Sequence, residues 1–236
     1  DAGVTFIDTA DSYGPYVSEE IIAEALVPYA DDVVIATKAG FVRPGPDQWL
    51  IDARPERLRE CAEGSLRRLK RDCIDFFQLH RIDPRVPLEE SLGALTALQR
   101  EGKIRHIGIS QISVDEYEKA KQTAVIVSVQ NRYNVEDRSS ENVLEACERD
   151  RIAFLPWFPL GGTGSPKHAA LTRIATAHGA KPTQVALAWL LARSRSILPI
   201  PGTSSIAHFD ENLAAVEIDL AADQLEELSS QNVVQT

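Results

Sequence analysis

Residues 33–38 read VVIATK and residues 74–80 read IDFFQLH, and these two stretches decide the class of fold. Both are almost continuously apolar, as expected of strands that are covered by helices on both faces. Each also ends in a side chain that is costly to bury, Lys38 in the first and His80 in the second. The pattern predicts buried parallel strands whose last residues are polar.

Similar runs recur along the chain and alternate with segments of helical period. Gly102 ends one periodic segment, and Pro182 opens another. Ser113, with Glu116 three residues later, has the spacing of a capping box. This repetition predicts an α/β protein with a parallel sheet. The expected strands are Val4–Asp8, Val33–Lys38, Ile74–His80, Ile104–Ser110, Ile126–Gln130, Ile152–Phe158 and Ile197–Pro201.

Two α/β architectures fit this alternation. A doubly wound sheet usually carries a glycine fingerprint after its first strand, whereas the glycines at 161–164 follow a late strand and lack that spacing. A (β/α)8 TIM barrel fits better, because barrel enzymes build their sites from polar residues at strand ends. We therefore predict a single barrel domain over residues 1–236. The polar strand ends are Asp8, Lys38, His80, Ser110 and Gln130.

The overall composition of the chain limits which binding partners and which cellular compartment we expect. The formal net charge of -10 disfavours binding to nucleic acid or to an anionic membrane. No apolar stretch reaches the ~20 residues that span a bilayer. Cys61, Cys73 and Cys147 lack metal-ligand or redox spacing, which is typical of reduced thiols. We therefore expect a cytoplasmic protein, and the sequence leaves its oligomeric state open.

Four polar side chains would converge at the mouth of such a barrel. Asp8, Lys38 and His80 end three strands. Tyr13 follows the first of these strands in a loop. Singly, each also fits a structural role: a turn acid, an edge charge, a core histidine or a packing tyrosine. Together they form a tuned proton donor, because an ammonium lowers the pKa of a nearby phenol and a carboxylate holds the ammonium in place. The hydride would have to come from a cofactor.

Motifs along most of the chain, from Val4 to about Asn212, resemble those of the aldo-keto reductase superfamily. In order they are FIDTADSYG, IATKAG, DFFQLH, IRHIGIS, VSVQNRYN, PWFPL and IPGTSS. The first and last blocks are most similar to the bacterial pyridoxal reductase-like (pyridoxine 4-dehydrogenase) branch. The resemblance implies a (β/α)8 barrel that interconverts carbonyl compounds and alcohols with NAD(P)H, usually NADPH. It also implies an N-terminal hairpin and a first strand and helix, which the given sequence lacks. We expect that they precede Asp1 in the complete protein, with a truncated protein as the alternative.

The resemblance assigns roles to the four residues at the mouth. Tyr13 is expected to be the general acid in reduction, with its pKa lowered by Lys38. Asp8 is expected to hold Lys38, and His80 to orient the substrate carbonyl. Asp11 matches none of these positions, and we interpret it as an acid that shapes the turn.

The same resemblance predicts residues that bind the nicotinamide end of the cofactor. Ser110, Gln111 and Gln130 would bind the carboxamide, although Gln111 stands where asparagine is common. Trp157 would stack on the nicotinamide, with a core tryptophan as the alternative. Pro159 and Leu160 would also contact the cofactor. The glycines at 161–164 would cover the pyrophosphate, unless they form a plain loop.

The adenine end is expected to bind near a short helix that begins after residue 205. Gly202 and His208 stand where the family commonly has lysine and arginine for the ribose phosphate of NADPH. We therefore expect NADPH, with modest discrimination against NADH. A plain N-cap is the alternative for Ser204 or Ser205. The expected contacts are Gly202, Thr203, Ser204, Ser205, His208, Glu211 and Asn212.

Phe41, Trp49 and Arg81 are candidates for contacts with a small carbonyl substrate because they lie on or near loops at strand ends, although surface packing would also explain them. Two other functions stay open. One is a regulatory or scaffolding subunit that binds cofactor with little turnover. The other is a metal-dependent barrel lyase or hydrolase. Because His80 is the only one of the 5 histidines that ends a predicted strand, we expect no metal site.

Overall fold

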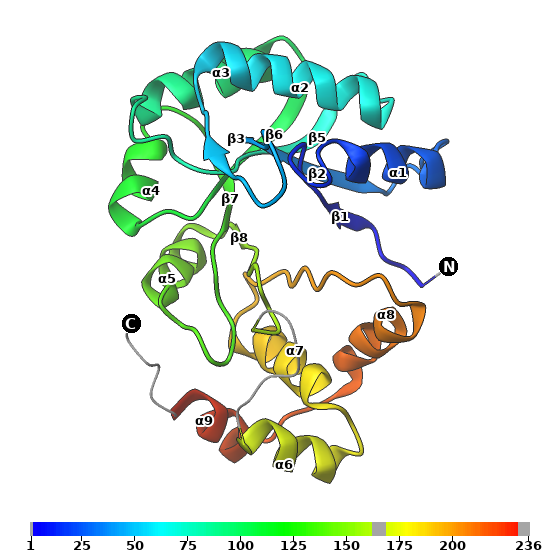
Figure 1. Cartoon of the computed structure of the whole chain (residues 1–236). Coiled ribbons are helices and arrows are strands. Elements are labelled where there is room, and N and C mark those ends of the chain that lie inside the picture. The colour runs from blue at the N-terminus through cyan, green and yellow to red at the C-terminus, as the bar shows by residue number, and fades with distance from the viewer. Residues whose placement is uncertain (1, 162–168, 231–236) are drawn as a thin grey trace. The chain divides into compact units, whose positions relative to one another are not determined.

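The computed structural model of the chain describes residues 2–161 and 169–230. The chain divides into two compact units, residues 1–129 and 130–236, which are considered one at a time. Figure 1 shows the course of the chain through both units.

The first unit is built on a parallel sheet whose strands follow the order β1-β2-β5-β6-β7 (Figure 1). The register places Asp8 opposite Ala36 and Lys38 opposite Gln78, so neighbouring strands end at nearly the same level. The predicted parallel α/β organisation of this unit is confirmed. The strands are β1 (Phe6–Asp8), β2 (Val34–Ala39), β5 (Ile74–Leu79), β6 (Ile104–Ser110) and β7 (Ile126–Gln130), the last of which ends at the boundary between the units.

Helices of the first unit pack beside one another and against this sheet. α1 packs on α2 and α2 on α3, while leucines such as Leu58, Leu92 and Leu95 are buried on the helical side. The predicted signals at helix ends are confirmed: Gly102 has a φ of 74° just after α3, and Ser113 forms the capping box of α4. The helices are α1 (Val17–Leu26), α2 (Pro55–Leu69), α3 (Leu88–Arg100) and α4 (Val114–Ala120).

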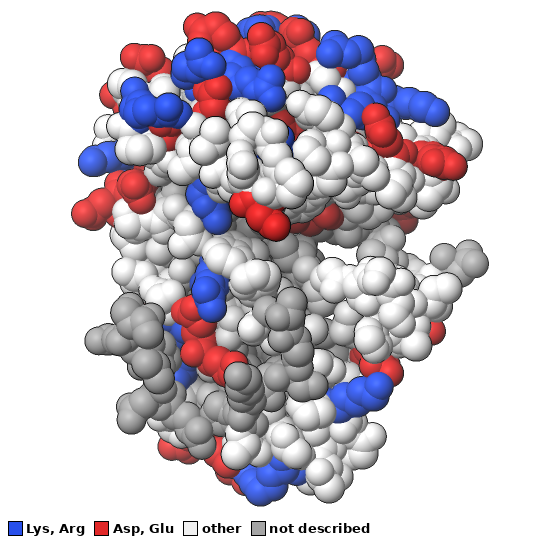
Figure 2. All heavy atoms as spheres, in the orientation of Figure 1, with Lys and Arg blue, Asp and Glu red and all other residues white. Residues whose placement is uncertain are grey.

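Charged side chains of both signs gather over α2 and α3 on the face shown in Figure 2. Arg59 of α2 pairs with Glu101 at 2.7 Å, and Lys103 pairs with Glu63 of α2 at 2.8 Å. Exposed pairs of this kind contribute at most about 1 kcal/mol each. This face is a solvated helical surface, so the chemistry must be sought at the ends of the strands.

A short antiparallel hairpin follows β2 and was not predicted. It pairs β3 (Phe41–Val42) with β4 (Leu50–Ile51). Gly40, with a φ of 132°, makes the turn into the hairpin, and a Cβ there would lie 3.3 Å from the backbone nitrogen of Arg81. Glycine at this position lets the hairpin start close to the end of β5.

The second unit contains one short strand, β8 (Ala153–Phe154), within its described residues. The predicted strand Ile152–Phe158 was therefore too long, because Trp157 forms only an isolated bridge with Arg132. The predicted strand Ile197–Pro201 was wrong, because Ile197 forms only an isolated bridge with Phe154. Prolines explain these differences, because Pro156 in the first run and Pro199 and Pro201 in the second cannot donate to a strand ladder. The helices are α5 (Glu141–Asp150), α6 (Ala169–His178), α7 (Pro182–Arg193), α8 (Ile206–Leu213), the 3-10 helix η1 (Ala214–Glu217) and α9 (Ala222–Ser230).

The core of the second unit forms around α7, which begins at Pro182 as predicted. Trp189 is buried and stacks on Tyr133 with their ring centroids 5.9 Å apart. Its indole nitrogen donates to Ser229 of α9 at 3.0 Å. None of the helices in the described ranges is long and apolar enough to cross a membrane.

Candidate active site

Lys38 is the centre of the candidate site in the first unit. Its side chain is fully buried, and Nζ donates to Asp8 Oδ2 at 2.7 Å and to the Thr9 carbonyl at 2.7 Å. The same nitrogen donates to the Tyr13 hydroxyl at 3.4 Å. The adjacent ends of β1 and β2 thus bring Asp8, Tyr13 and Lys38 into direct contact, which is the convergence that the sequence predicts.

The charge of Lys38 is maintained by its neighbours. Burial alone would lower the pKa of Lys38, but attraction to Asp8 and Tyr13 outweighs this effect, so the pKa lies above its usual 10.5. The side chain is therefore a permanent ammonium at neutral pH. A fixed positive charge beside a phenol stabilises the phenolate that forms when the phenol gives up its proton.

His80 follows β5 and lies beside this cluster. Its backbone nitrogen donates to the Ala39 carbonyl at 2.8 Å, and its ring centroid is 5.9 Å from that of Tyr13. Burial, together with the charges of Lys38 and Arg81, holds the pKa of His80 well below 6.5. The imidazole is therefore neutral at pH 7, and a neutral imidazole presents one N–H donor.

Gln78 completes the cluster and was missed by the sequence analysis. Its side-chain nitrogen donates to Asp8 Oδ1 at 3.2 Å, so both carboxylate oxygens of Asp8 are engaged. Gln78 and His80 are two residues apart and so share one face of the extended chain. A polar residue at this spacing within a buried apolar strand was the signal that could have identified Gln78.

The three substrate candidates gather around His80. The Phe41 ring centroid lies 4.7 Å from the His80 ring and 5.2 Å from the Trp49 ring. The guanidinium carbon of Arg81 lies 5.3 Å from the Phe41 ring centroid. The unpredicted hairpin supplies both aromatic residues, so these side chains form a wall beside the histidine. Their contact with a substrate stays a prediction.

Arg43 is a further residue of this wall that the sequence analysis missed. Its guanidinium carbon lies 3.9 Å from the Trp49 ring centroid, and Nη1 donates to the Ser12 carbonyl at 3.4 Å. Arg43 therefore joins the tip of the hairpin to the loop that carries Tyr13.

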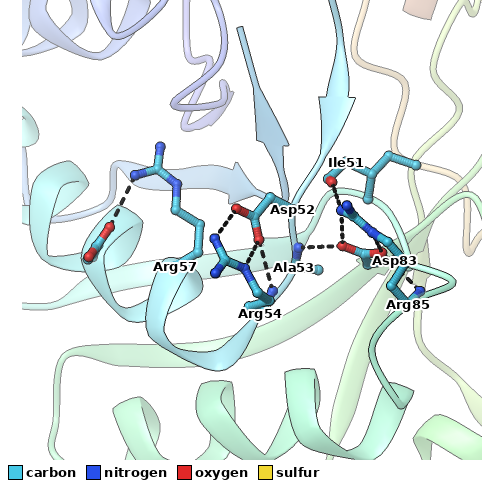
Figure 3. Close-up of polar contacts among 8 residues, drawn as sticks. Ile51, Asp52, Ala53, Arg54, Arg57, Asp83 and Arg85 are labelled. Carbon is cyan, nitrogen blue, oxygen red and sulfur yellow. Dashed lines mark hydrogen bonds and ion pairs between the residues drawn. The ribbon is translucent and has the colours of Figure 1, made fainter. Parts of the chain in front are cut away.

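A charged clamp holds the hairpin against the segment after His80. Figure 3 shows the buried Asp83 carboxylate between Arg85 and the backbone of Ala53. Arg85 Nη2 donates to Asp83 at 2.8 Å and to the Ile51 carbonyl at 2.5 Å. The hydrogen bonds from Arg85 lower the pKa of Asp83 to about 2. The clamp thus fixes the hairpin residues relative to His80.

The first-unit cofactor candidates lie at the end of β6. Ser110 is buried, and its hydroxyl accepts a hydrogen bond from Arg81 Nη1 at 3.2 Å. Gln111 is exposed and has a φ of 55°, a left-handed conformation that redirects the chain after the strand. Ser110 is therefore placed next to the wall around His80.

In the second unit, the chain after Gln130 lies beside Trp157. Gln130 is buried, and the Trp157 backbone nitrogen donates to the Asn131 carbonyl at 3.0 Å. The Trp157 ring is half-buried and lies 4.8 Å from the Phe158 ring. Pro159 is buried and Leu160 half-buried. Of the predicted glycine loop, residues 162–164 lie outside the described residues.

The start of α8 carries the other predicted cofactor contacts. Ser205 is the N-cap, since its hydroxyl accepts from the His208 backbone nitrogen at 3.3 Å, which confirms the structural alternative for this serine. Gly202, Thr203, Ser204 and His208 are exposed around it. An exposed helix start with nearby hydroxyls is chemically suited to a phosphate.

Glu211 and Asn212 lie near the end of α8. Lys181 pairs with the Glu211 carboxylate, and Gln184 donates to the Glu211 carbonyl at 3.0 Å. Asn212 is half-buried. Glu211 thus ties α8 to the start of α7 within the second unit.

Behind the Tyr13 loop lies a buried polar network that the sequence did not reveal. Glu19 is fully buried, accepts from Thr37 Oγ1 at 2.5 Å and pairs with Arg68 at 2.7 Å. Asp11 is also buried, and this burial raises its pKa to about 6, while a hydrogen bond with Cys61 opposes the shift. The turn is made by the Asp11 backbone, so interpreting its carboxyl as turn-shaping was wrong.

The ends of β1, β2 and β5 and the loop after β1 bring a carboxylate, an ammonium, an imidazole and a phenol together. Such a group of polar side chains at strand ends is typical of sites in α/β barrels. The chain belongs to the aldo/keto reductase family, whose profile matches residues 1–232. Within the described residues, no group of histidine, cysteine, aspartate and glutamate side chains could hold a metal ion.

Similar proteins support this membership. The chain is 44% identical over 229 residues to an uncharacterized oxidoreductase of Schizosaccharomyces pombe, covering 97% of this chain and 74% of that protein. It is 42% identical over 232 residues to pyridoxine 4-dehydrogenase of Escherichia coli, and the match covers 96% of this chain and 81% of that protein. The chain is also similar to the crystal structure of an aldo-keto reductase from Klebsiella pneumoniae in complex with NADPH, with 30% sequence identity and a TM-score of 0.85. This match covers 100% of this chain and 84% of that chain. The predicted barrel fold class and the predicted family are confirmed.

Proposed function

We propose that this protein is an NADP(H)-dependent oxidoreductase that reduces an aldehyde or ketone to an alcohol, with Tyr13 as the general acid. The observation that carries the proposal is the set of contacts of Lys38 Nζ, which reaches Asp8 at 2.7 Å and the Tyr13 hydroxyl at 3.4 Å. A buried ammonium held by a carboxylate has a clear chemical use beside a phenol that must donate a proton.

The residues of each unit are chemically suited to parts of NADPH, which would supply the hydride when bound. In the first unit, the hydroxyl of Ser110 and the amide of Gln111 can hydrogen-bond a carboxamide. In the second unit, Trp157 offers an aromatic face, and the exposed start of α8 offers backbone N–H groups to a phosphate. Because Gly202 and His208 provide no permanent cation, we expect only modest discrimination between NADPH and NADH.

The first-unit side chains divide the work on the carbonyl. Tyr13 donates its phenolic proton to the carbonyl oxygen as this oxygen becomes an alcohol, and the ammonium of Lys38 stabilises the phenolate left behind. Asp8 keeps Lys38 in place. The neutral imidazole of His80 donates a hydrogen bond to the same oxygen and orients it. Phe41 and Trp49 help to exclude water from this reaction.

For the substrate class we propose an aromatic aldehyde similar to pyridoxal. The aromatic wall of Phe41 and Trp49 beside His80 suits a flat ring. The 42% identity to pyridoxine 4-dehydrogenase of Escherichia coli also supports this class. A panel of aliphatic and aromatic aldehydes, pyridoxal included, tests it through NADPH oxidation followed by absorbance.

The variant Tyr13→Phe tests the mechanism. Loss of the positioned acid should lower kcat by about 10²–10⁴-fold, while NADPH binding and the unfolding temperature stay close to those of the unchanged protein. Tyr29→Phe is a matched control, because the Tyr29 hydroxyl donates to the Leu69 carbonyl at 2.8 Å, away from the site. Turnover by Tyr13→Phe at the unchanged rate would refute the assignment. NADPH binding without turnover by the unchanged protein would favour a regulatory subunit.

A further inference from the structure

An amide side chain lies inside β5, the apolar strand that leads to the candidate site. Gln78 is fully buried, and its neighbours along the chain are the buried Phe77 and Leu79. Among the described residues its amide makes one hydrogen bond, from Nε2 to Asp8 Oδ1 at 3.2 Å, while Oε1 is buried without a partner. Burial of an amide that is only partly hydrogen-bonded costs free energy. The stability of the strand therefore does not explain this residue.

The neighbouring strands accommodate this amide beside Lys38. The register places Gln78 between Lys38 of β2 and Gly108 of β6, so the three residues lie in one row across the sheet. A Cβ at position 108 would lie 3.0 Å from Gln78 Cγ and 2.7 Å from Ser128 Oγ. Glycine at this position leaves the space that the Gln78 side chain occupies. The packing of the strands is thus compatible with an amide directed at Asp8.

Asp8 accepts a hydrogen bond on each carboxylate oxygen, and the two donors come from different strands. Gln78 donates to Oδ1, and Lys38 donates to Oδ2 at 2.7 Å. Donors on both oxygens oppose rotation of the carboxylate about its Cβ–Cγ bond. Lys38 Nζ lies 3.4 Å from the Tyr13 hydroxyl, farther than from Asp8 or from the Thr9 carbonyl, which is at 2.7 Å. A small displacement of the ammonium would therefore break its contact with Tyr13 first.

We propose that Gln78 is a positioning residue, which fixes the Asp8 carboxylate so that Lys38 keeps its ammonium beside the Tyr13 hydroxyl. The inference rests on the proposed function, because it adds a residue to the same site. Gln78 acts through Asp8 and needs no contact with the substrate or the cofactor. Without its amide the carboxylate can turn, and the ammonium loses its fixed place beside the phenol. Proton transfer from Tyr13 then slows.

The variant Gln78→Leu tests this role, because it removes the amide and keeps a side chain of similar size. With the aldehyde that the unchanged protein reduces fastest, kcat at saturating NADPH should fall by about 10–100-fold. KM for NADPH should stay close to that of the unchanged protein. The midpoint of urea unfolding should change little, because the buried apolar side chain offsets the lost bond to Asp8. A kcat equal to that of the unchanged protein would overturn the inference.

The variant Gln78→Glu should rescue turnover in a way that depends on pH. A neutral carboxyl group has one O–H donor, so it can replace the amide toward Asp8. Burial and the charge of Asp8 both raise the pKa of the new carboxyl, which is therefore neutral at about pH 6. At this pH its kcat should exceed that of Gln78→Leu by about 5-fold or more. The advantage should shrink as the new carboxyl ionises at higher pH. Equal kcat values of the two variants at about pH 6 would overturn the inference.

Ser128→Ala is the matched control for both variants. Ser128 adjoins the same row at Gly108, is fully buried, and has a hydroxyl without a hydrogen-bond partner among the described residues. The variant removes a polar group next to Gln78 and leaves the bond to Asp8 in place. Its kcat should equal that of the unchanged protein. A loss as large as that of Gln78→Leu would mean that turnover responds to any change inside the sheet, and it would overturn the inference.

A measurement by NMR separates this inference from the proposed function. If the unchanged protein with NADPH reduced no aldehyde, the proposed function would fail, and the ammonium of Lys38 would still report on Gln78. This ammonium is buried and donates to Asp8 and to the Thr9 carbonyl, so its protons should exchange slowly with water.

The protein is labelled with nitrogen-15 in its lysines, and the Lys38 signal is assigned by its loss in Lys38→Met. The signal should shift or broaden in Gln78→Leu and stay in place in Ser128→Ala. A Lys38 signal that is the same in Gln78→Leu as in the unchanged protein would overturn the inference, whether or not the protein turns over an aldehyde.

Discussion

The two faces of β2 carry buried polar pairs that look alike and to which we assign different roles. Lys38 faces Asp8 at 2.7 Å, and the adjacent Thr37 faces Glu19 at 2.5 Å on the opposite side of the strand. Both Lys38 and Glu19 have fully buried side chains. Only the Lys38 pair adjoins a phenol and an imidazole. Burial of charge therefore does not identify a reactive site by itself; a buried charge becomes reactive where reacting groups surround it.

The strongest test of this comparison is Lys38→Met. Removal of the ammonium should lower kcat by about 10²–10⁴-fold, because the Tyr13 phenolate loses its stabilising charge. It should also lower the free energy of unfolding by about 3–5 kcal/mol, because Asp8 stays buried without its cation. The measurements are kcat at saturating NADPH and urea unfolding.

The double variant Asp8→Asn/Lys38→Met separates these two effects. Removing both charges should recover much of the lost stability, since no uncompensated charge stays buried. Turnover should stay as low as in Lys38→Met. Recovery of turnover together with stability would show that Lys38 acts only as a structural residue, like Glu19.

The variant Glu19→Gln tests the other face of the strand. The amide loses the charged hydrogen bond to Arg68, so the free energy of unfolding should fall by about 1.5–3 kcal/mol. The folded protein should keep its kcat, because Glu19 touches no group of the proposed mechanism. Urea unfolding gives the free energy of unfolding, and steady-state kinetics on the same preparation give kcat. A fall in kcat as large as that of Lys38→Met would break the comparison.

The parts of the first unit that depend on local pattern were predictable. Apolar runs located β2, β5 and β6, and the polar residues at their ends located Lys38, His80 and Ser110. The resemblance to a known family then supplied roles that burial and spacing alone could not. The predicted strand Ile152–Phe158 was too long and Ile197–Pro201 was wrong, because the apolar runs were counted without weighing the prolines inside them.

The parts that depend on tertiary packing were not predictable from one sequence. Glu19 and Arg68 are 49 residues apart, and nothing near either residue indicates their ion pair. Arg43 became part of the wall through a hairpin of two-residue strands, which are too short to show a period. Asp11 was misread for the same reason, since its burial comes from residues of α2 such as Cys61.

The smallest effect is expected from Asp11→Asn, which removes a carboxyl that burial disfavours. Its pKa is about 6 in the folded protein and 3.8 without the fold, so between these values the folded state binds more protons. Stability attributable to Asp11 is therefore present at low pH and is lost as pH rises through about 6. The neutral amide avoids this loss, so Asp11→Asn should raise the free energy of unfolding at pH 7 by about 1–2 kcal/mol.

The pH dependence of that gain identifies Asp11 as its source. His80 acts in the opposite direction: its pKa is depressed, so its contribution is lost as pH falls below 6.5. His80 affects Asp11→Asn and the unchanged protein equally, so its effect cancels in the difference between their free energies of unfolding. This difference should grow from pH 4 to pH 6 and then level off. Asp32→Asn removes a carboxyl at an exposed position in the same way and serves as the control. If the difference in free energy of unfolding between Asp11→Asn and the unchanged protein did not change with pH, the Asp11 carboxyl would be solvated in the folded protein. The buried network behind the Tyr13 loop would then consist of Glu19, Thr37 and Arg68.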